Sequence, residues 1–236
     1  DHLFCLEDYT VTHNSTILNE ILYKWIMEEP YTVGILALES TNREFSKLLA
    51  SRHLKRKLAG MTQEEGEEFL LSHKEDNREL FFYPNGDPRF YYMEELDGDI
   101  ERVKELILSM ILTCNCKVIV IDPLQDLFAG FDTKEEEEFL SWLKMIIKRY
   151  NLIIVCVNHI RKQDSKANPD KMYSESEIHG SSTIIKASFL TILLNRNKYL
   201  DKDDPQSNVT TVVISKNRNT GLTGPCPFLY YDRNTH

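Results

Sequence analysis

The chain has 236 residues, 42% of them hydrophobic and 28% charged, which is typical of a soluble globular domain of moderate size with a full core. No apolar run approaches the roughly 20 residues that a membrane span needs, no signal peptide opens the chain, and an odd five cysteines indicate neither a disulfide framework nor a zinc site, so we expect a cytosolic protein. The net charge of −9 argues against a uniformly basic surface for nucleic acid, so any such binding would need a local patch or a channel built by several subunits.

The first half of the chain is predicted to alternate helices and strands. An apolar stripe at helical spacing predicts a helix over Thr16–Glu28, and the run TVGILALES predicts a buried strand over Thr32–Ser40 that ends near Glu39. The other elements expected here are helices over Asn42–Leu58 and Ile100–Leu112, an acidic helical surface segment at 61–79, a short strand over Leu80–Tyr83 and a loop over Pro84–Pro88.

The stretch KVIVIDPLQDLF, residues 117–128, is the most informative in the chain. Val118–Ile121 is a continuous β-branched run, which is typical of a strand buried on both faces of a parallel sheet. Ligands of open α/β sheets bind outside the carboxyl ends of the strands, so Asp122 is expected to point at a bound ligand. Nucleotide-hydrolysing P-loop proteins place there the acid that holds Mg²⁺. An ordinary buried strand with a capping Asp is the alternative.

The second half begins with alternation and ends in consecutive strands. The expected elements are a helix over Lys134–Tyr150, a strand over Leu152–Val157, a polar mobile loop over 161–180, and strands over Phe189–Leu194, Val209–Ser215 and Phe228–Tyr231. This order predicts the α/β class, with a mostly parallel central sheet that is flanked by helices and finished by antiparallel C-terminal edge strands.

Several segments carry a resemblance to a known family. They are LALES (36–40), VIVIDPLQDL (118–127), EIHGSSTIIKAS with ILLNRN (177–188 and 192–197) and ISKNRNTGLTG (214–224). In this order they resemble the RecA-like P-loop ATPase domain of the superfamily four replicative DNA helicases, the DnaB-like and phage primase-helicase group, from Ser15 to about Tyr231. The resemblance implies ATP and Mg²⁺ at the subunit interfaces of a homo-hexamer, movement on single-stranded DNA, a primase and a helicase loader as further partners, no membrane, and a bacterial or phage-infected cytoplasm.

By this resemblance Asp122 is the Walker B acid and Glu39 the carboxylate that activates the attacking water. The chemistry needs this division, because one acid must hold the metal while another accepts a proton. His159 matches the histidine that senses the γ-phosphate in the phage members. The alternatives are a surface acid at a strand end for Glu39 and a core or surface histidine for His159.

Lys216 and Arg218 match a pair that reaches into the ATP site of the neighbouring subunit, with Arg218 as the arginine finger. Two cations one residue apart on a strand share a face, as a clamp on one triphosphate requires. The alternative is that this Lys-x-Arg protects an edge strand against aggregation.

The segment from Glu177 to Lys186 matches the channel loop that holds single-stranded DNA. The residues expected to bind phosphates, without reading bases, are Gly180, Ser181, Ser182 and Lys186. His179 and Gly180 stand where the family usually has Arg-Gly, which bears on the strength of the contact with DNA.

The front of the chain departs furthest from the family. The phosphate loop reads G-x-x-x-x-G-K-[ST], with the Lys on the phosphates and the hydroxyl on Mg²⁺. Ser15 and Thr16 fit its end as nucleotide-binding residues, and Ser15 would bind Mg²⁺ together with Asp122. His13 and Asn14, however, stand where Gly-Lys belongs.

Residues 1–14, DHLFCLEDYTVTHN, resemble the C-terminal end of an intein, which leaves residues 15–236 as the ATPase domain. In that chemistry Ser15 is the nucleophile, Asn14 cyclises to cut the chain after itself, and His13 polarises the bond that is cut. A substituted, inactive phosphate loop is the alternative.

Two other functions are open. A recombinase-type or circadian-type RecA ATPase would bind DNA or protein without unwinding, and a ring component that has lost ATP binding would explain the missing Lys. The EIHGSS segment and the pair of Lys216 and Arg218 favour the helicase.

Overall fold

A parallel sheet forms the centre of the first of two structural units. The computed structural model describes residues 14–58, 60–94, 99–159, 181–196, 200 and 203–230. Of these, the residues within 14–130 and 145–157 form the first unit, and those within 131–144 and 158–230 form the second. Each unit has a sheet of its own.

The first unit holds most of the helices that the structure describes. Its strands are β1 (Val33–Ala37), β2 (Phe90–Glu94), β3 (Val118–Asp122) and β4 (Ile153–Cys156). Its helices are α1 (Asn14–Glu28), α2 (Asn42–His53), α3 (Gln63–Ser72), α4 (Lys74–Phe81), α5 (Ile100–Leu112) and α6 (Leu124–Leu127). Helix α7 (Thr133–Tyr150) begins in the second unit and ends in the first.

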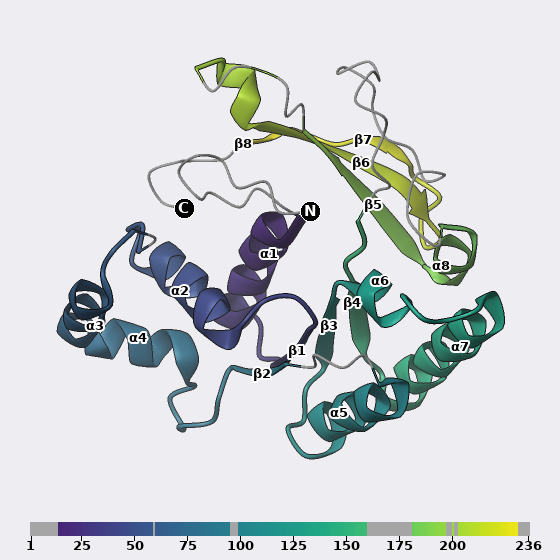
Figure 1. Ribbon diagram of the computed structural model, residues 1–236, viewed down its shortest axis with the longest axis horizontal. Helices are drawn as coiled ribbons and strands as arrows, with labels where there is room; N and C mark the ends of the chain where they lie inside the picture. The colour runs from purple at the N-terminus through teal and green to yellow at the C-terminus, as the bar shows by residue number, and fades with distance from the viewer. Residues whose placement is uncertain are drawn as a thin grey trace. The chain divides into compact units, whose positions relative to one another are not determined.

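The strands of the first unit run in parallel in the order β2-β1-β3-β4 (Figure 1). Ala37, the last residue of β1, lies opposite Glu94 at the end of β2 and opposite Asp122 at the end of β3. Three neighbouring strands therefore end at the same level of the sheet. Their carboxyl ends form one edge, where open α/β sheets bind ligands.

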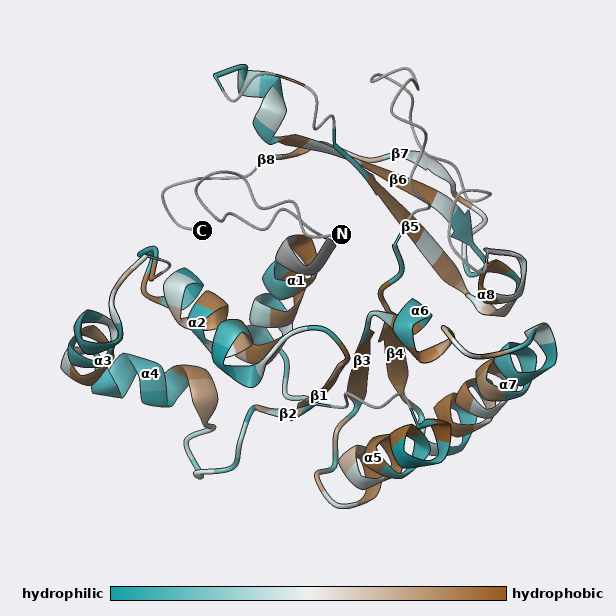
Figure 2. Cartoon of the chain, viewed as in Figure 1, coloured by the Kyte–Doolittle hydropathy of each residue, from teal (hydrophilic) through white to brown (hydrophobic). Residues whose placement is uncertain are grey.

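Different helices cover the two faces of β1. Val33 and Ile35 belong to the buried cluster that includes α1 and α2, whereas Gly34 faces α5. A Cβ atom on Gly34 would lie 2.7 Å from Sδ of Met110 and 2.9 Å from Cδ1 of Ile119. Figure 1 shows α1 and α2 on one side of the sheet and α5 on the other, and Figure 2 shows most of β3 and β4 as hydrophobic. β1 and β3, at the centre of the sheet, are thus buried on both faces, which explains their uninterrupted apolar runs.

The second unit is built on antiparallel strands. Its elements are α8 (Ser181–Ala187), β5 (Leu190–Asn195), the 3₁₀ helix η2 (Pro205–Asn208), β6 (Val209–Asn217), β7 (Gly224–Pro225) and β8 (Leu229–Tyr230). Strand β6 pairs with β5, β7 and β8, so it is the centre of this sheet. The pairing of β5 with β6 sets Thr191 opposite Lys216 and shifts register after Thr191.

The parallel sheet with its helices confirms the predicted α/β class. The antiparallel strands form a separate sheet in the second unit, whereas they were expected at the edge of the first. In the part of the chain that the structure describes, no helix is both long and apolar enough to cross a membrane.

The strand predicted over Leu80–Tyr83 is wrong. Leu80 and Phe81 end helix α4, and Phe82 forms only an isolated bridge with Pro88. Leu80 is fully buried, and the apolar face of a helix end gives the same short apolar run as a strand. The strand of this region is β2, formed by FYYME ten residues further on from Leu80.

Two further element boundaries differ from those predicted from the sequence. The helix predicted over Asn42–Leu58 ends at His53, because Lys55 takes a positive φ of 51° that a right-handed helix cannot contain. The loop predicted through Lys186 is helical from Ser181, as α8. The polar loop predicted over 161–180 lies outside the described residues.

Candidate functional site

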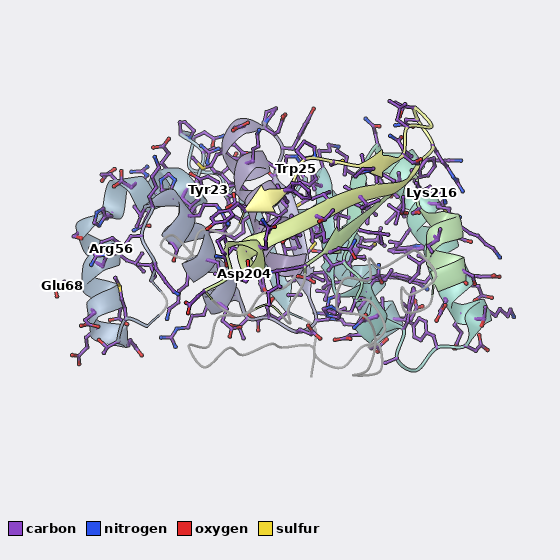
Figure 3. All side chains as sticks on the ribbon, turned by 90° about the horizontal axis from the view of Figure 1, so that it is seen from above. Tyr23, Trp25, Arg56, Glu68, Asp204 and Lys216 are labelled. Atoms are coloured by element: carbon purple, nitrogen blue, oxygen red, sulfur yellow. The ribbon has the colours of Figure 1, made fainter. Side chains whose placement is uncertain are left out.

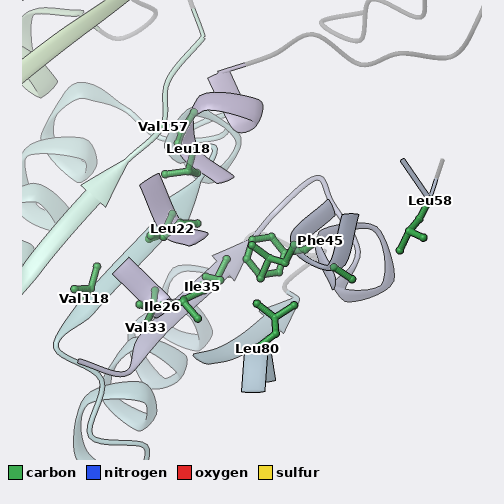
Figure 4. Packing of buried hydrophobic residues seen from close by; sticks show 13 residues of the cluster. Leu18, Leu22, Ile26, Val33, Ile35, Phe45, Leu58, Leu80, Val118 and Val157 are labelled. Carbon is green, nitrogen blue, oxygen red and sulfur yellow. The ribbon is translucent and has the colours of Figure 1, made fainter. Parts of the chain in front are cut away.

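The first turn of α1 points toward the carboxyl edge of the parallel sheet. Leu18, near the start of α1, packs beside Val157 after β4, whereas Ile26, near its end, packs beside Val33 at the start of β1 (Figure 4). The helix therefore runs opposite to the strands. The first N–H groups of a helix have no partner within it and attract anions. Ser15 lies in this first turn, so its backbone is placed where a phosphate would bind.

Asp122 ends β3, and Glu39 comes shortly after the neighbouring strand β1 of the same sheet. The backbone N–H of Leu38 donates a 2.9 Å hydrogen bond to the carbonyl oxygen of Asp122, which ties the end of β1 to the end of β3. Glu39 comes next in the chain and is exposed to solvent. The fold thus brings two carboxylates, far apart in the sequence, to one edge.

The carboxyl edge is acidic. Burial, together with the negative charges of Asp122, Glu94 and Glu44, raises the pKa of Tyr92 to about 12, although its hydrogen bond with Ser40 acts in the opposite direction. A triphosphate at this edge would be repelled by the same charges unless cations accompanied it.

The donor set at this edge fits Mg²⁺ that arrives with a nucleotide. Within the described ranges, no three His, Cys, Asp or Glu side chains gather to hold a metal ion by themselves. Mg²⁺ is usually bound by one or two protein oxygens with phosphate oxygens and water as the remaining ligands. Asp122, the last residue of β3, offers one carboxylate ligand of this kind at the edge.

His159 lies in the second unit. The chain passes from the first unit into the second between Val157 and Asn158, and the side chain of His159 is buried there. Its role as a γ-phosphate sensor therefore stays a prediction.

Lys216 and Arg218 both contact the last turn of α8. Nζ of Lys216 donates to the carbonyl oxygen of Ile185, and Nη2 of Arg218 donates to that of Lys186 at 2.7 Å. Figure 3 labels Lys216 toward the end of β6. The guanidinium of Arg218 also lies over the ring of Phe189, 5.3 Å from its centroid. Carbonyl groups at a helix end have no partner within the helix and attract cations, which explains both contacts.

The residues predicted to bind DNA lie at α8. Ser182 and Lys186 are exposed on this helix, and Ser181 begins it. Gly180 lies outside the described residues, as does His13 of the predicted splice junction. Asn14 and Ser15, on the two sides of that junction, are consecutive residues of α1.

Sequence reasoning missed Tyr92 and Glu94 because it missed β2. Their signal was the segment FYYME, in which the tyrosine and the acid stand two residues apart and therefore share a face of a strand.

Residues 21–165 match the family model of the AAA domain. The chain is 25% identical over 216 residues to the replicative DNA helicase DnaB of Mycobacterium leprae, which covers 88% of this chain and 34% of that protein. It is 24% identical over 216 residues to the replicative DNA helicase DnaB of Mycobacterium intracellulare, covering 88% of this chain and 36% of that protein. The chain thus spans about a third of the length of the curated relatives that it matches.

Two solved structures have the same fold. The ATPase domain of another protein superposes with a TM-score of 0.68 at 16% identity, covering 94% of this chain and 80% of that one. A DnaB-like replicative helicase, studied with its interactions with primase, superposes with a TM-score of 0.65 at 17% identity, covering 89% of this chain and 50% of that one. These likenesses confirm that this chain has the predicted RecA-like fold.

Proposed function

The chain belongs to the AAA domain family, and on that basis we propose that it is the ATP-hydrolysing motor domain of a replicative DNA helicase, acting on single-stranded DNA as a homo-hexamer. The observation that carries the proposal is the edge where Asp122 ends β3 and Glu39 comes shortly after β1, toward which the first turn of α1 points. The similarity to DnaB helicases supports the choice of substrate.

Each residue of this edge has a separate role in ATP hydrolysis. Backbone N–H groups of the first turn of α1, with Ser15 and Thr16, bind phosphate oxygens. Asp122 and the Ser15 hydroxyl hold Mg²⁺, which, when bound, neutralises charge that develops on the phosphates. Glu39 accepts a proton from the attacking water, and His159 senses the γ-phosphate.

The second unit supplies groups for the neighbouring subunit and for DNA. Arg218 acts as the arginine finger of a neighbour's site and Lys216 assists it, which makes the ring necessary for turnover. Backbone and hydroxyl groups from Gly180 to Ser182, with Lys186, bind the DNA backbone. We also propose a primase and a helicase loader as partners and the cytoplasm of a bacterium or a phage-infected cell as the location, without a role for a membrane.

We propose that residues 1–14 are the C-terminal end of an intein and that residues 15–236 are the ATPase domain. His13, Asn14 and Ser15 then carry out the splicing steps. Splicing joins Ser15 to an upstream segment that supplies the missing Gly-Lys of the phosphate loop. The coding sequence upstream tests this, because an intein body preceded by a Gly-rich segment ending in Gly-Lys must be found there.

The helicase proposal is tested with the spliced protein by measuring ATP turnover with and without single-stranded DNA, and strand displacement from a forked duplex. A Glu39→Gln variant is the control, since it keeps nucleotide binding and loses hydrolysis. Turnover without strand displacement would favour a recombinase-type ATPase. Absence of nucleotide binding would favour a ring component without ATPase activity.

A further inference from the structure

The segment that carries Glu39 is held at both of its ends. On the side of β3, the Leu38 N–H donates to the carbonyl oxygen of Asp122. On the side of β2, the Tyr92 hydroxyl donates to the carbonyl oxygen of Ser40 at 2.9 Å. Glu39 is the single residue between these two fixed points.

Tyr92 makes two hydrogen bonds with Ser40. The Tyr92 hydroxyl also lies 2.7 Å from Oγ of Ser40. Because the Tyr92 hydroxyl donates its hydrogen to the Ser40 carbonyl, its oxygen accepts a hydrogen bond from the Ser40 hydroxyl. A phenol is protonated at physiological pH, so Tyr92 keeps donating this hydrogen bond.

A second side chain of β2 fixes the continuation of the same segment. Glu94, two residues after Tyr92 and on the same face of β2, accepts a 2.7 Å hydrogen bond from the backbone N–H of Asn42. Thr41 caps α2 by a reciprocal pair of bonds with Glu44. Residues 40–42 are therefore attached to β2 by side chains, in addition to the pairing of β2 with β1.

We infer that Tyr92 is a positioning residue for Glu39, which it holds at the distance from the nucleotide that proton transfer requires. The inference rests on the proposed function for the role of Glu39. Its physical reason is that an exposed carboxylate in a two-residue bend would otherwise sample many positions, and a displacement of about 1 Å in a catalytic group can cost about a hundredfold in rate.

Tyr92→Phe tests the inference, because it removes the hydroxyl and keeps the ring. That ring packs 5.1 Å from the ring of Phe45, measured between centroids, so the variant should remain folded. In the spliced protein we expect kcat to fall about tenfold to a hundredfold, with KM for ATP changed less than about threefold. Ser40→Ala, which keeps the carbonyl acceptor, should show a smaller fall in kcat than Tyr92→Phe.

Tyr91→Phe is the matched control. Tyr91 is the neighbouring residue of β2, on its opposite face, and among the described residues its hydroxyl makes no hydrogen bond. The control should keep the kcat of the parent. An unchanged kcat in Tyr92→Phe, or an equal loss in Tyr91→Phe, would overturn the inference.

Amide hydrogen exchange supplies a readout that does not need hydrolysis. Tyr92→Phe should speed exchange in the 38–42 segment about tenfold, with the exchange of β3 unchanged. If the parent does not turn over ATP, the proposed function fails, and exchange still tests whether Tyr92 fixes the segment. Unchanged exchange in Tyr92→Phe would show that Tyr92 does not hold the bend.

Discussion

Nη2 of Arg218 donates a 2.7 Å hydrogen bond to the carbonyl oxygen of Lys186. The residue proposed for a neighbour's ATP and the residue proposed for DNA are thus joined within one unit, through the backbone of Lys186. The Lys186 side chain is exposed and is not needed for this bond. The two proposed roles can therefore be tested separately by substitution.

Lys186→Ala should weaken binding of single-stranded DNA about equally for all sequences, because a contact with phosphate carries no base information. The slope of log affinity against log salt should fall by about 0.7, the value for one phosphate contact on a single strand. ATP turnover without DNA should change little, since the carbonyl that Arg218 contacts remains. Fluorescence anisotropy at several salt concentrations measures the affinity and the slope.

The control for this substitution is Lys134→Ala, an exposed lysine of the second unit whose ammonium pairs with Glu138. It should leave DNA affinity unchanged. If Lys186→Ala keeps both the affinity and the salt slope of the parent, Lys186 does not contact DNA.

Mixing two inactive variants should restore ATP turnover if Arg218 acts across subunits. Arg218→Ala lacks the finger and Glu39→Gln lacks the base, so mixed rings contain some sites with a normal Glu39 and a neighbour's normal Arg218. Turnover of the mixture, in spliced form, should exceed that of either variant alone. Mixed rings that are shown to form and still do not turn over ATP would disprove action in trans.

The chain of 236 residues should not hydrolyse ATP as it stands. It lacks the Lys of the phosphate loop, and one charge-assisted phosphate contact contributes about 1.5 to 3 kcal/mol to binding. Replacing residues 1–14 with a strand and a Gly-rich loop that ends in Gly-Lys, fused to Ser15, should restore nucleotide binding and DNA-stimulated turnover. Comparable turnover before and after the replacement would refute both the intein proposal and the argument from the missing Lys.

Gly34→Ala should lower the free energy of unfolding by about 1 to 3 kcal/mol, the usual cost of overpacking. The new Cβ would meet the side chains of Met110 and Ile119 at under 3 Å. Gly66→Ala is the matched control, since Gly66 lies inside α3 with nothing within 4 Å of the added atom, and it should stabilise by about 0.5 to 1 kcal/mol. Urea unfolding measures both. Equal effects of the two substitutions would contradict the close packing of α5 on β1.

Alkaline pH should destabilise the fold in part through Cys116. Burial, with a smaller contribution from Cys114, raises the pKa of the Cys116 thiol from 9.0 to about 12. Above pH 9 the unfolded chain loses this proton while the folded chain keeps it, so the contribution is present below pH 9 and disappears between pH 9 and about 12. Urea unfolding of the parent and of Cys116→Ala across this range should show a steeper fall for the parent. Parallel curves would exclude Cys116 as a cause.

Much of the first sheet was predictable because the residues of its central strands favour a buried strand over other secondary structures. Val118–Ile121 is β-branched and apolar throughout, and it forms β3 as predicted. β2 was missed because FYYME is half-exposed at the sheet edge and lacks a clean alternation. α8 was missed because Ser-Ser-Thr resembles a loop, although the residues after it continue as a helix.

The candidate site divides in the same way. The position of Asp122 and Glu39 at the ends of strands could be predicted because an acid after an apolar run has a local signal, whereas their roles stay predictions. The contact of Tyr92 with Ser40 joins residues 52 positions apart, and no local pattern predicts it. It depends on β2 lying beside β1, which only the folded chain establishes. The contacts of Lys216 and Arg218 with α8 were hidden for the same reason.

During synthesis of the chain, β1 leaves the ribosome before either of its neighbours in the order β2-β1-β3-β4. The backbone N–H and C=O groups along its two edges stay unpaired until Phe90–Glu94 and then Val118–Asp122 have followed, and unpaired edges of an apolar strand invite association with other chains. Because β3 completes the pairing of β1 and also ends in Asp122, both edges of β1 are paired and the carboxylate edge forms at one step, before β4 pairs with β3. A nascent chain that stalls before Asp122 therefore has an open sheet and no edge at which a bound nucleotide would stabilise it.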